Sequence, residues 1–156
     1  MTTLYSIIES PAHPDLSKFY KRYGFNQLKF NSQRKAISAL KKEKPDFVVA
    51  EFFYGYGNNY AGVNVSNLDV FLHSQRKYAP EAKIIVLAQP REYPHVQKLA
   101  EQNANYYFII KNYKEKKYNI KLKKLLKKYK PKKIIILNKT LNGPVHSLLQ
   151  VKKRPL

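Results

Sequence analysis

The sequence predicts an α/β fold in which parallel strands alternate with helices in a three-layer α/β/α arrangement. Short apolar runs typical of strands alternate with longer segments of helical periodicity through the first 130 residues. The run at residues 47–52 is apolar at nearly every position, as expected of a central strand covered by helices on both faces. Gly24 and Pro45 punctuate the alternation, since glycine commonly ends a helix and proline disfavours helix in the residue before it.

Successive strand and helix segments account for residues 4–129. The predicted strands cover residues 4–8, 27–30, 47–52, 83–87 and 106–110. The predicted helices cover residues 15–23, 67–78, 93–102 and 114–129, with one more from Asn31 or Ser32 to Lys44. A long loop over residues 54–67 connects the third strand to the third helix.

The helices are predicted from their apolar faces and from the signals at their ends. Gly24 is the expected left-handed stop of the first helix, and Pro94 is tolerated in the first turn of the fourth. In the second helix, one face carries Ala36, Ile37 and Leu40. The third helix contributes the apolar side chains Leu68, Phe71 and Leu72.

The fifth predicted helix combines an apolar stripe with a strongly basic face. The stripe consists of Tyr118, Leu122, Leu125, Leu126 and Tyr129. The remaining positions include Lys116, Lys117, Lys121, Lys123, Lys124, Lys127 and Lys128. We expect the stripe to pack on the sheet and the lysines to face solvent.

The formal net charge of +20 is concentrated near the C-terminal end of the sequence. Residues 1–110 hold 14 Lys and Arg against 9 Asp and Glu, whereas residues 111–156 hold 16 against 1. A surface this basic attracts polyanions such as nucleic acids through salt-dependent phosphate contacts. The alternative is that the lysines of the fifth helix only solvate one face of the domain.

Composition excludes several other classes of protein. The chain has no cysteine, so it has no disulfide, no thiolate nucleophile and no cysteine-based zinc site. Its apolar runs fall far short of the roughly 20 residues that span a bilayer. Residues 1–9 have no basic start and contain Glu9, unlike a secretory signal. We therefore expect a cytoplasmic protein with no membrane association.

A single domain with a C-terminal tail is expected. Residues 1–130 form the α/β domain, and residues 131–156 form a basic C-terminal extension. In that extension, the apolar runs 133–137 and 145–151 flank the turn signal Asn142–Gly143, so they are candidates for an additional strand or hairpin at the sheet edge. The final basic residues, 152–154, are expected to be mobile.

Four segments of residues 3–129 resemble the receiver domains of bacterial response regulators. These segments are residues 22–25 (RYGF), 44–46 (KPD), 83–87 (KIIVL) and 103–106 (NANY). The resemblance implies a flavodoxin-like, doubly wound sheet with strand order 2-1-3-4-5. It also implies a regulatory role through protein partners, which in this family contact the surface of the fourth helix, fifth strand and fifth helix. A second copy of the chain is an alternative partner at that surface.

The resemblance also assigns site residues, most of which are altered here. Glu51 stands where receivers have the phospho-accepting Asp, and Glu9 and Ser10 stand where they have an acidic pair. Among the switch residues, Ala88 replaces a Ser or Thr, and Phe108 matches the aromatic. Lys111 matches the lysine that contacts phosphate, although Asn112 replaces the proline that follows it.

These exchanges predict that the reaction of the family is lost. Glu51 is one methylene longer than Asp, which displaces the reacting oxygen by about 1 Å and costs on the order of 100-fold in rate. Ser10 removes a carboxylate from the Mg²⁺ site, and Ala88 has no hydroxyl to contact a phosphoryl group. The prediction is a non-catalytic, signal-independent module without cofactor, in which Glu51 pairs with Lys111. A solvated Glu51 at a strand end is the alternative.

The sequence suggests three other functional hypotheses, each with less support than the receiver resemblance. Residues 54–62 mix glycine with tyrosine, so this loop could recognise a base or nucleotide. His13 and His95, together with Glu9 and Glu51, could hold a metal ion, although their spacing matches no metal motif. Asp46, Glu81 and Lys83 superficially match the acid, acid and lysine pattern of metal-dependent nucleases. However, Asp46 and Lys83 are expected at the amino ends of parallel strands, whereas those nucleases generally carry these residues on an antiparallel pair.

Overall fold

The computed structural model describes residues 1–11, 13, 15–55, 66–102, 106–110, 135–137 and 148–150 of the 156-residue chain. Within this part, the strands are β1 (Thr2–Ile7), β2 (Phe25–Phe30), β3 (Phe47–Glu51), β4 (Lys83–Ala88), β5 (Tyr106–Ile110), β6 (Ile135–Leu137) and β7 (Leu148–Gln150). The α-helices are α1 (Ser17–Arg22), α2 (Gln33–Leu40), α3 (Asp69–Tyr78) and α4 (Tyr93–Gln102). A 3₁₀ turn, η1 (Pro90–Glu92), precedes α4.

The strands form one sheet in the order β2-β1-β3-β4-β5-β6-β7. All pairs from β2 to β6 are parallel, and only β6 and β7 pair in antiparallel fashion at the edge. The predicted order 2-1-3-4-5 is therefore confirmed. β6 and β7 lie within the predicted apolar runs of the extension and continue the same sheet beyond β5.

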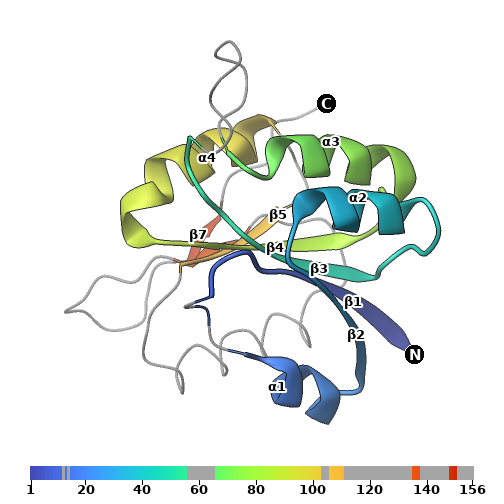
Figure 1. Ribbon diagram of the computed structural model, residues 1–156. Coiled ribbons are helices and arrows are strands. Elements are labelled where there is room, and N and C mark those ends of the chain that lie inside the picture. The colour runs from blue at the N-terminus through green and yellow to red at the C-terminus, as the bar shows by residue number, and fades with distance from the viewer. Residues whose placement is uncertain are drawn as a thin grey trace.

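Helices cover both faces of the sheet, with α2, α3 and α4 on one face and α1 on the other (Figure 1). The central strand β3 has apolar side chains on both faces, which explains why both faces are covered. Its Val48 and Ala50 pack into the cluster under α2, α3 and α4, whereas Phe47 and Val49 pack toward α1. Successive side chains of a strand point to opposite faces, so an apolar run without alternation can be buried only between two helical layers.

The α1 layer is held by aromatic packing. Tyr20 of α1 is 1% exposed and contacts Phe25 edge to face, with ring centroids 6.5 Å apart. Phe25 in turn meets Phe47 at 5.7 Å. Gly24 makes the turn between α1 and β2 with φ +75°, which is the left-handed stop that the sequence predicted.

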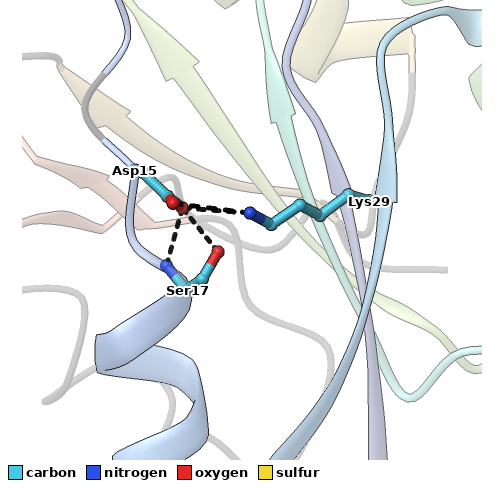
Figure 2. Close-up of polar contacts among 3 residues, drawn as sticks. All are labelled: Asp15, Ser17 and Lys29. Carbon is cyan, nitrogen blue, oxygen red and sulfur yellow. Dashed lines mark hydrogen bonds and ion pairs between the residues drawn. The ribbon is translucent and has the colours of Figure 1, made fainter.

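The ends of the first two helices differ from the prediction because polar side chains define them. The first helix begins at Ser17 rather than at Asp15, because the Asp15 carboxylate accepts a hydrogen bond from the Ser17 N–H at 3.0 Å (Figure 2). The second helix has Ser32 as its N-cap, as expected, but ends at Leu40, four residues earlier than predicted. Lys41 to Lys44 have no apolar residue to bury, so nothing holds them on the sheet.

Some predicted features lie outside the described residues. They are the helix over 114–129, the Asn142–Gly143 turn, the middle of the loop after β3 and the mobile end at 152–154. No helix in the described part of the chain combines the length and the apolar character needed to cross a membrane.

Candidate functional site at the carboxyl edge

The carboxyl ends of the parallel strands meet at one edge of the sheet, where α/β folds of this type bind their ligands. Glu51 ends β3 at this carboxyl edge, and it is only 2% exposed. Its Oε2 atom accepts a hydrogen bond from the Ser10 N–H at 2.9 Å. The alternative of a solvated Glu51 is therefore wrong: this carboxylate is buried and ties the segment after β1 to the end of β3.

Glu9 lies next to this contact but has a different partner. Its Oε1 atom accepts a hydrogen bond from the side-chain amide of Gln33, in the first turn of α2, at 2.9 Å. The structure thus brings Glu9, Ser10 and Glu51 together as the resemblance implied, with Glu9 bonded to α2 and Glu51 bonded to the Ser10 backbone. Gln33 was missed by sequence reasoning, because a glutamine in a first helical turn is an ordinary residue there.

Asn67 fixes the backbone around the end of β3. Its Nδ2 donates to the Glu51 carbonyl oxygen at 2.9 Å, and its Oδ1 accepts from the Phe53 N–H at 2.8 Å. The side chain is 7% exposed, so these bonds are made away from water. Sequence reasoning placed Asn67 only at the start of a helix. Its reach back across the long loop to β3 was not visible in the sequence.

Ser66 and Tyr54 close the base of the same loop. They form an isolated antiparallel bridge, and the Ser66 hydroxyl donates to Asp69 at 2.7 Å while accepting from the Leu68 N–H at 3.1 Å. These bonds link Ser66 to the first residues of α3. The helix begins at Asp69 rather than at the predicted Asn67. The loop therefore leaves and rejoins the domain at fixed points, while residues 56–65 between them are outside the described part.

Glu92 joins two loops of the carboxyl edge. Its carboxylate accepts from the Gln89 N–H at 2.9 Å, which is the capping box of η1, and from the Tyr54 N–H at 3.3 Å. Glu92 is 9% exposed. The spacing of Gln89 and Glu92, three residues apart, is the sequence pattern of this capping box, and it was not part of the prediction, which began the helix at Tyr93.

An aromatic contact lies beside these Glu92 hydrogen bonds. The Tyr54 ring stacks on the His95 imidazole with centroids 3.4 Å apart and planes inclined by 13°. Tyr54 remains 56% exposed, so one large aromatic surface stays accessible to solvent at this edge. Because His95 stacks on Tyr54, it is positioned by the loop after β3 rather than by a metal ion.

The switch positions divide between described and undescribed residues. Ala88 ends β4 and is 3% exposed within the apolar cluster under α2, α3 and α4. Phe108 lies in β5, where its backbone is paired with Val86 and Ile136. Lys111, the predicted partner of Glu51, is outside the described residues, as are Lys116, Lys117, Lys121, Lys123, Lys124, Lys127 and Lys128. Pairing of Glu51 with Lys111 stays a prediction.

The two catalytic or metal-binding alternatives find no support in the geometry. The described residues contain no group of three or more His, Asp or Glu side chains able to hold a metal ion, so His13, His95, Glu9 and Glu51 do not form one. Asp46 and Lys83 lie at the amino ends of parallel strands, as argued from the sequence. The Asp46 carboxylate accepts a hydrogen bond from the Thr3 N–H at 2.8 Å.

A groove of about 460 Å³ opens beside the carboxyl edge, between β1, β2 and the start of α1. Its lining includes the buried hydroxyl of Tyr20, whose pKa burial raises, and the ion pair between Asp15 and Lys29, at 3.3 Å (Figure 2). Hydrogen bonds from Ser17, followed by the contact with Lys29, lower the pKa of Asp15 to about 2. Asp15 and Lys29 offset each other's charge, which leaves Lys35 as the other charged lysine of the lining.

No protein-family model matches the sequence, and no curated protein is significantly similar to it. Solved structures do resemble the fold. NtrX from Brucella abortus, determined in complex with ATP, is 15% identical with a TM-score of 0.60, over 80% of this chain and 26% of the NtrX chain. The chain thus spans about a quarter of NtrX.

Two smaller proteins are covered almost completely. The response regulator TrrA from Thermotoga maritima, determined in complex with Mg²⁺ and BeF, is 19% identical with a TM-score of 0.55, over 80% of this chain and 99% of TrrA. A CheY-like receiver domain protein from Methanospirillum hungatei is 11% identical with a TM-score of 0.57, over 81% and 94%. At these identities the likeness establishes the fold, which is that of a response-regulator receiver domain.

Proposed function

We propose that this chain is an atypical receiver module that acts through protein partners without phosphorylation of a carboxylate. The observation that carries the proposal is the buried Glu51 carboxylate at the end of β3, bonded to the Ser10 N–H at 2.9 Å. In a receiver, the carboxylate at this position attacks a phosphoryl group that a hard cation neutralises. Glu51 is one methylene longer than Asp and its Oε2 is held by the Ser10 N–H, so we expect its oxygens to lie away from the position that an Asp carboxylate would occupy.

The other side chains at the edge favour the same function. Ala88 has no hydroxyl with which to contact a phosphoryl group. Glu9 is bonded to Gln33, so binding a cation would compete with that bond. Asn67 and Glu92 connect the loops after β3 and β4 to neighbouring backbone. These contacts support our proposal of a non-catalytic module held in one conformation, which we place in the cytoplasm.

Incubation with a small phosphodonor and Mg²⁺, followed by intact mass and peptide mapping, tests the absence of phosphorylation. We expect no added phosphate on the wild-type chain, under conditions in which a receiver with Asp at the same position becomes fully labelled. A matched variant, Glu51→Asp with Ser10→Asp and Ala88→Thr, restores the residue types of the family and is expected to gain some labelling. Phosphate on Glu51 of the wild-type chain would overturn the proposal.

The partner surface is expected on α4, β5 and the predicted helix over 114–129. On α4, Gln97 and Lys98 are exposed and available for contact. A pull-down with the full chain as bait, repeated with Gln97→Arg and Lys98→Glu together, tests this surface. Loss of a protein partner with this variant, but not with Arg34→Glu on the exposed side of α2, is the expected result. Unchanged capture would place the partner elsewhere.

A further inference from the structure

The edge of the sheet opposite Glu51 carries a separate basic surface. Here α2 and α3 end and β3 and β4 begin, at the same end of the domain as the start of β1 (Figure 1). We call it the amino-edge surface, and it consists of Lys41, Lys42, Lys44, Arg76, Lys77 and Lys83. All except the half-buried Lys83 are exposed. The acidic residues that flank these basic residues at the same edge are Glu43, Asp46 and Glu81.

Three of these lysines are held over aromatic rings. The Nζ atoms of Lys41 and Lys77 lie 5.8 Å and 5.4 Å from the centroid of the Tyr78 ring. The Nζ atom of Lys83 lies 4.8 Å from the centroid of the Phe47 ring. A cation over a ring keeps its charge and its hydrogen-bond donors while its side chain loses freedom. Lysines ordered in this way lose less conformational entropy when they bind an anion.

The carboxylates nearby do not neutralise this surface. The one ion pair among the described residues joins Asp15 and Lys29, far from these lysines in the sequence. Asp46 accepts a hydrogen bond from the Thr3 N–H at 2.8 Å, and Glu43 accepts one from the Thr3 hydroxyl at 3.4 Å. Glu43, Asp46 and Glu81 together offset three of the six positive charges, so the surface keeps a formal charge of +3.

Complementarity to the helix dipole explains only part of the pattern. Cations in the last turn of a helix are stabilised by its partial negative charge, which accounts for Arg76 and Lys77 in α3 and for Lys41 at the end of α2. Lys44 and Lys83 instead precede or begin strands, where no such dipole acts. A helix-capping role therefore leaves half of the basic surface unexplained.

We propose that the amino-edge surface binds the phosphate backbone of a nucleic acid, independently of its sequence. Ordered, unpaired cations fit a row of phosphates, and the total charge of +20 favours the encounter. A membrane surface fits less well, because peripheral binding combines cations with exposed apolar side chains. Among the described residues, the exposed large hydrophobics are Met1, which precedes β1, and Tyr54 and Val70, which lie near the carboxyl edge, so Met1 is the one such side chain at the amino end of β1. This inference is independent of the proposed function, since Glu51 and its loops lie at the other edge.

Fluorescence anisotropy with labelled single-stranded RNA and double-stranded DNA of mixed sequence, titrated with the full chain over a salt series, tests the proposal. The test variant is Lys41→Gln, Lys77→Gln and Lys83→Gln. The control, Lys18→Gln, Arg34→Gln and Arg91→Gln, removes the same charge from exposed positions elsewhere. We expect the test variant to bind at least about 10-fold more weakly at 0.1 M salt, with a salt slope shallower by about 2. The control is expected to change the affinity by less than about 3-fold.

Several results would overturn the proposal. Equal losses in the two variants would mean that only net charge matters, and no binding by the wild-type chain would remove its basis. Tighter binding to phosphatidylserine vesicles than to either nucleic acid would assign the surface to a membrane. If the test variant loses its circular dichroism signal, Lys42→Gln, Lys44→Gln and Arg76→Gln provide the same test without touching the ring contacts. Unchanged binding by that folded variant would equally contradict the proposal.

Discussion

The two edges of the sheet use their charged residues in opposite ways. At the carboxyl edge, Glu51, Glu9 and Glu92 are at least partly buried, and each accepts a hydrogen bond from the backbone or side chain of another loop or helix. At the amino edge, Lys41 and Lys77 are exposed, and their described contacts are with an aromatic ring. Charges of the first kind fix the conformation of the chain, and charges of the second kind stay available to a partner. Substitutions at the two edges should therefore separate stability from binding.

Replacing Asn67 should have the largest effect on stability. Asn67→Ala removes two hydrogen bonds and leaves the Glu51 carbonyl and the Phe53 N–H without this partner in a largely buried site. We expect the free energy of unfolding to fall by about 2–4 kcal/mol. Urea denaturation measures it, with Asn26→Ala on the exposed side of β2 as the control, expected to cost less than about 0.5 kcal/mol. A loss for Asn67→Ala no greater than for the control would show that the two Asn67 hydrogen bonds contribute little to stability.

Glu51 comes next, and two variants separate its charge from its hydrogen bond. Glu51→Ala removes the acceptor of the Ser10 N–H, which we expect to lower the free energy of unfolding by about 1.5–3 kcal/mol. Glu51→Gln keeps an acceptor of similar shape and should cost about 1 kcal/mol or less. Equal losses measured by urea denaturation would mean that the negative charge itself holds the site together. That outcome would favour the predicted pairing with Lys111.

Glu92→Ala is expected to lower the free energy of unfolding by about 1–2 kcal/mol, because it removes the acceptor shared by Gln89 and Tyr54. Amide hydrogen exchange gives a local readout, with faster exchange at Tyr54 and Gln89. Glu81→Ala changes an exposed carboxylate on the connection before β4 and serves as the matched control. Unchanged exchange at Tyr54 would show that the two loops are not coupled through Glu92.

Substitutions at the amino edge should lower the free energy of unfolding only slightly. Lys41→Gln with Lys77→Gln removes two cation–π contacts with Tyr78, and such contacts at exposed sites contribute about 0.5–1 kcal/mol each at most. We expect a total loss of about 1 kcal/mol or less by urea denaturation. A loss as large as that of Asn67→Ala would make these lysines structural and weaken the contrast between the edges.

The sequence predicted the fold better than the site, for physical reasons. Helix and strand periodicity, together with Gly24 and the apolar run of β3, depends on local chemistry, so the alternation of strands and helices followed from it. The order β2-β1-β3-β4-β5 was implied by the resemblance to receiver domains. The burial of Glu51 depends on the Ser10 N–H, 41 residues away, and the role of Asn67 depends on a loop that returns to β3. Contacts between distant loops leave no periodic signal. Of these contacts, only the capping box of Glu92 joins residues that are close in the sequence.

The smallest effect is expected from pH, at Asp15. Its pKa is about 2 in the folded chain against an ordinary value of 3.8, because Ser17 and then Lys29 favour the charged form. A lowered pKa stabilises the folded state above pH 3.8, and this contribution disappears as the pH falls from 3.8 through about 2. Because Asp15 is exposed, solvent screens the contribution and it is small.

The melting temperatures of the wild-type chain and of Asp15→Asn should therefore differ slightly at neutral pH and converge below about pH 2. An NMR titration of the Asp15 carboxyl in Ser17→Ala, which removes the side-chain hydrogen bond but keeps the backbone bond, should show a pKa between the two values. An unchanged pKa in that variant would assign the shift to the Ser17 N–H or to Lys29. Lys29→Gln then separates the two: a return of the pKa to its ordinary value would make the surface ion pair the source of the pH dependence, and an unchanged pKa would assign it to the backbone at the helix start.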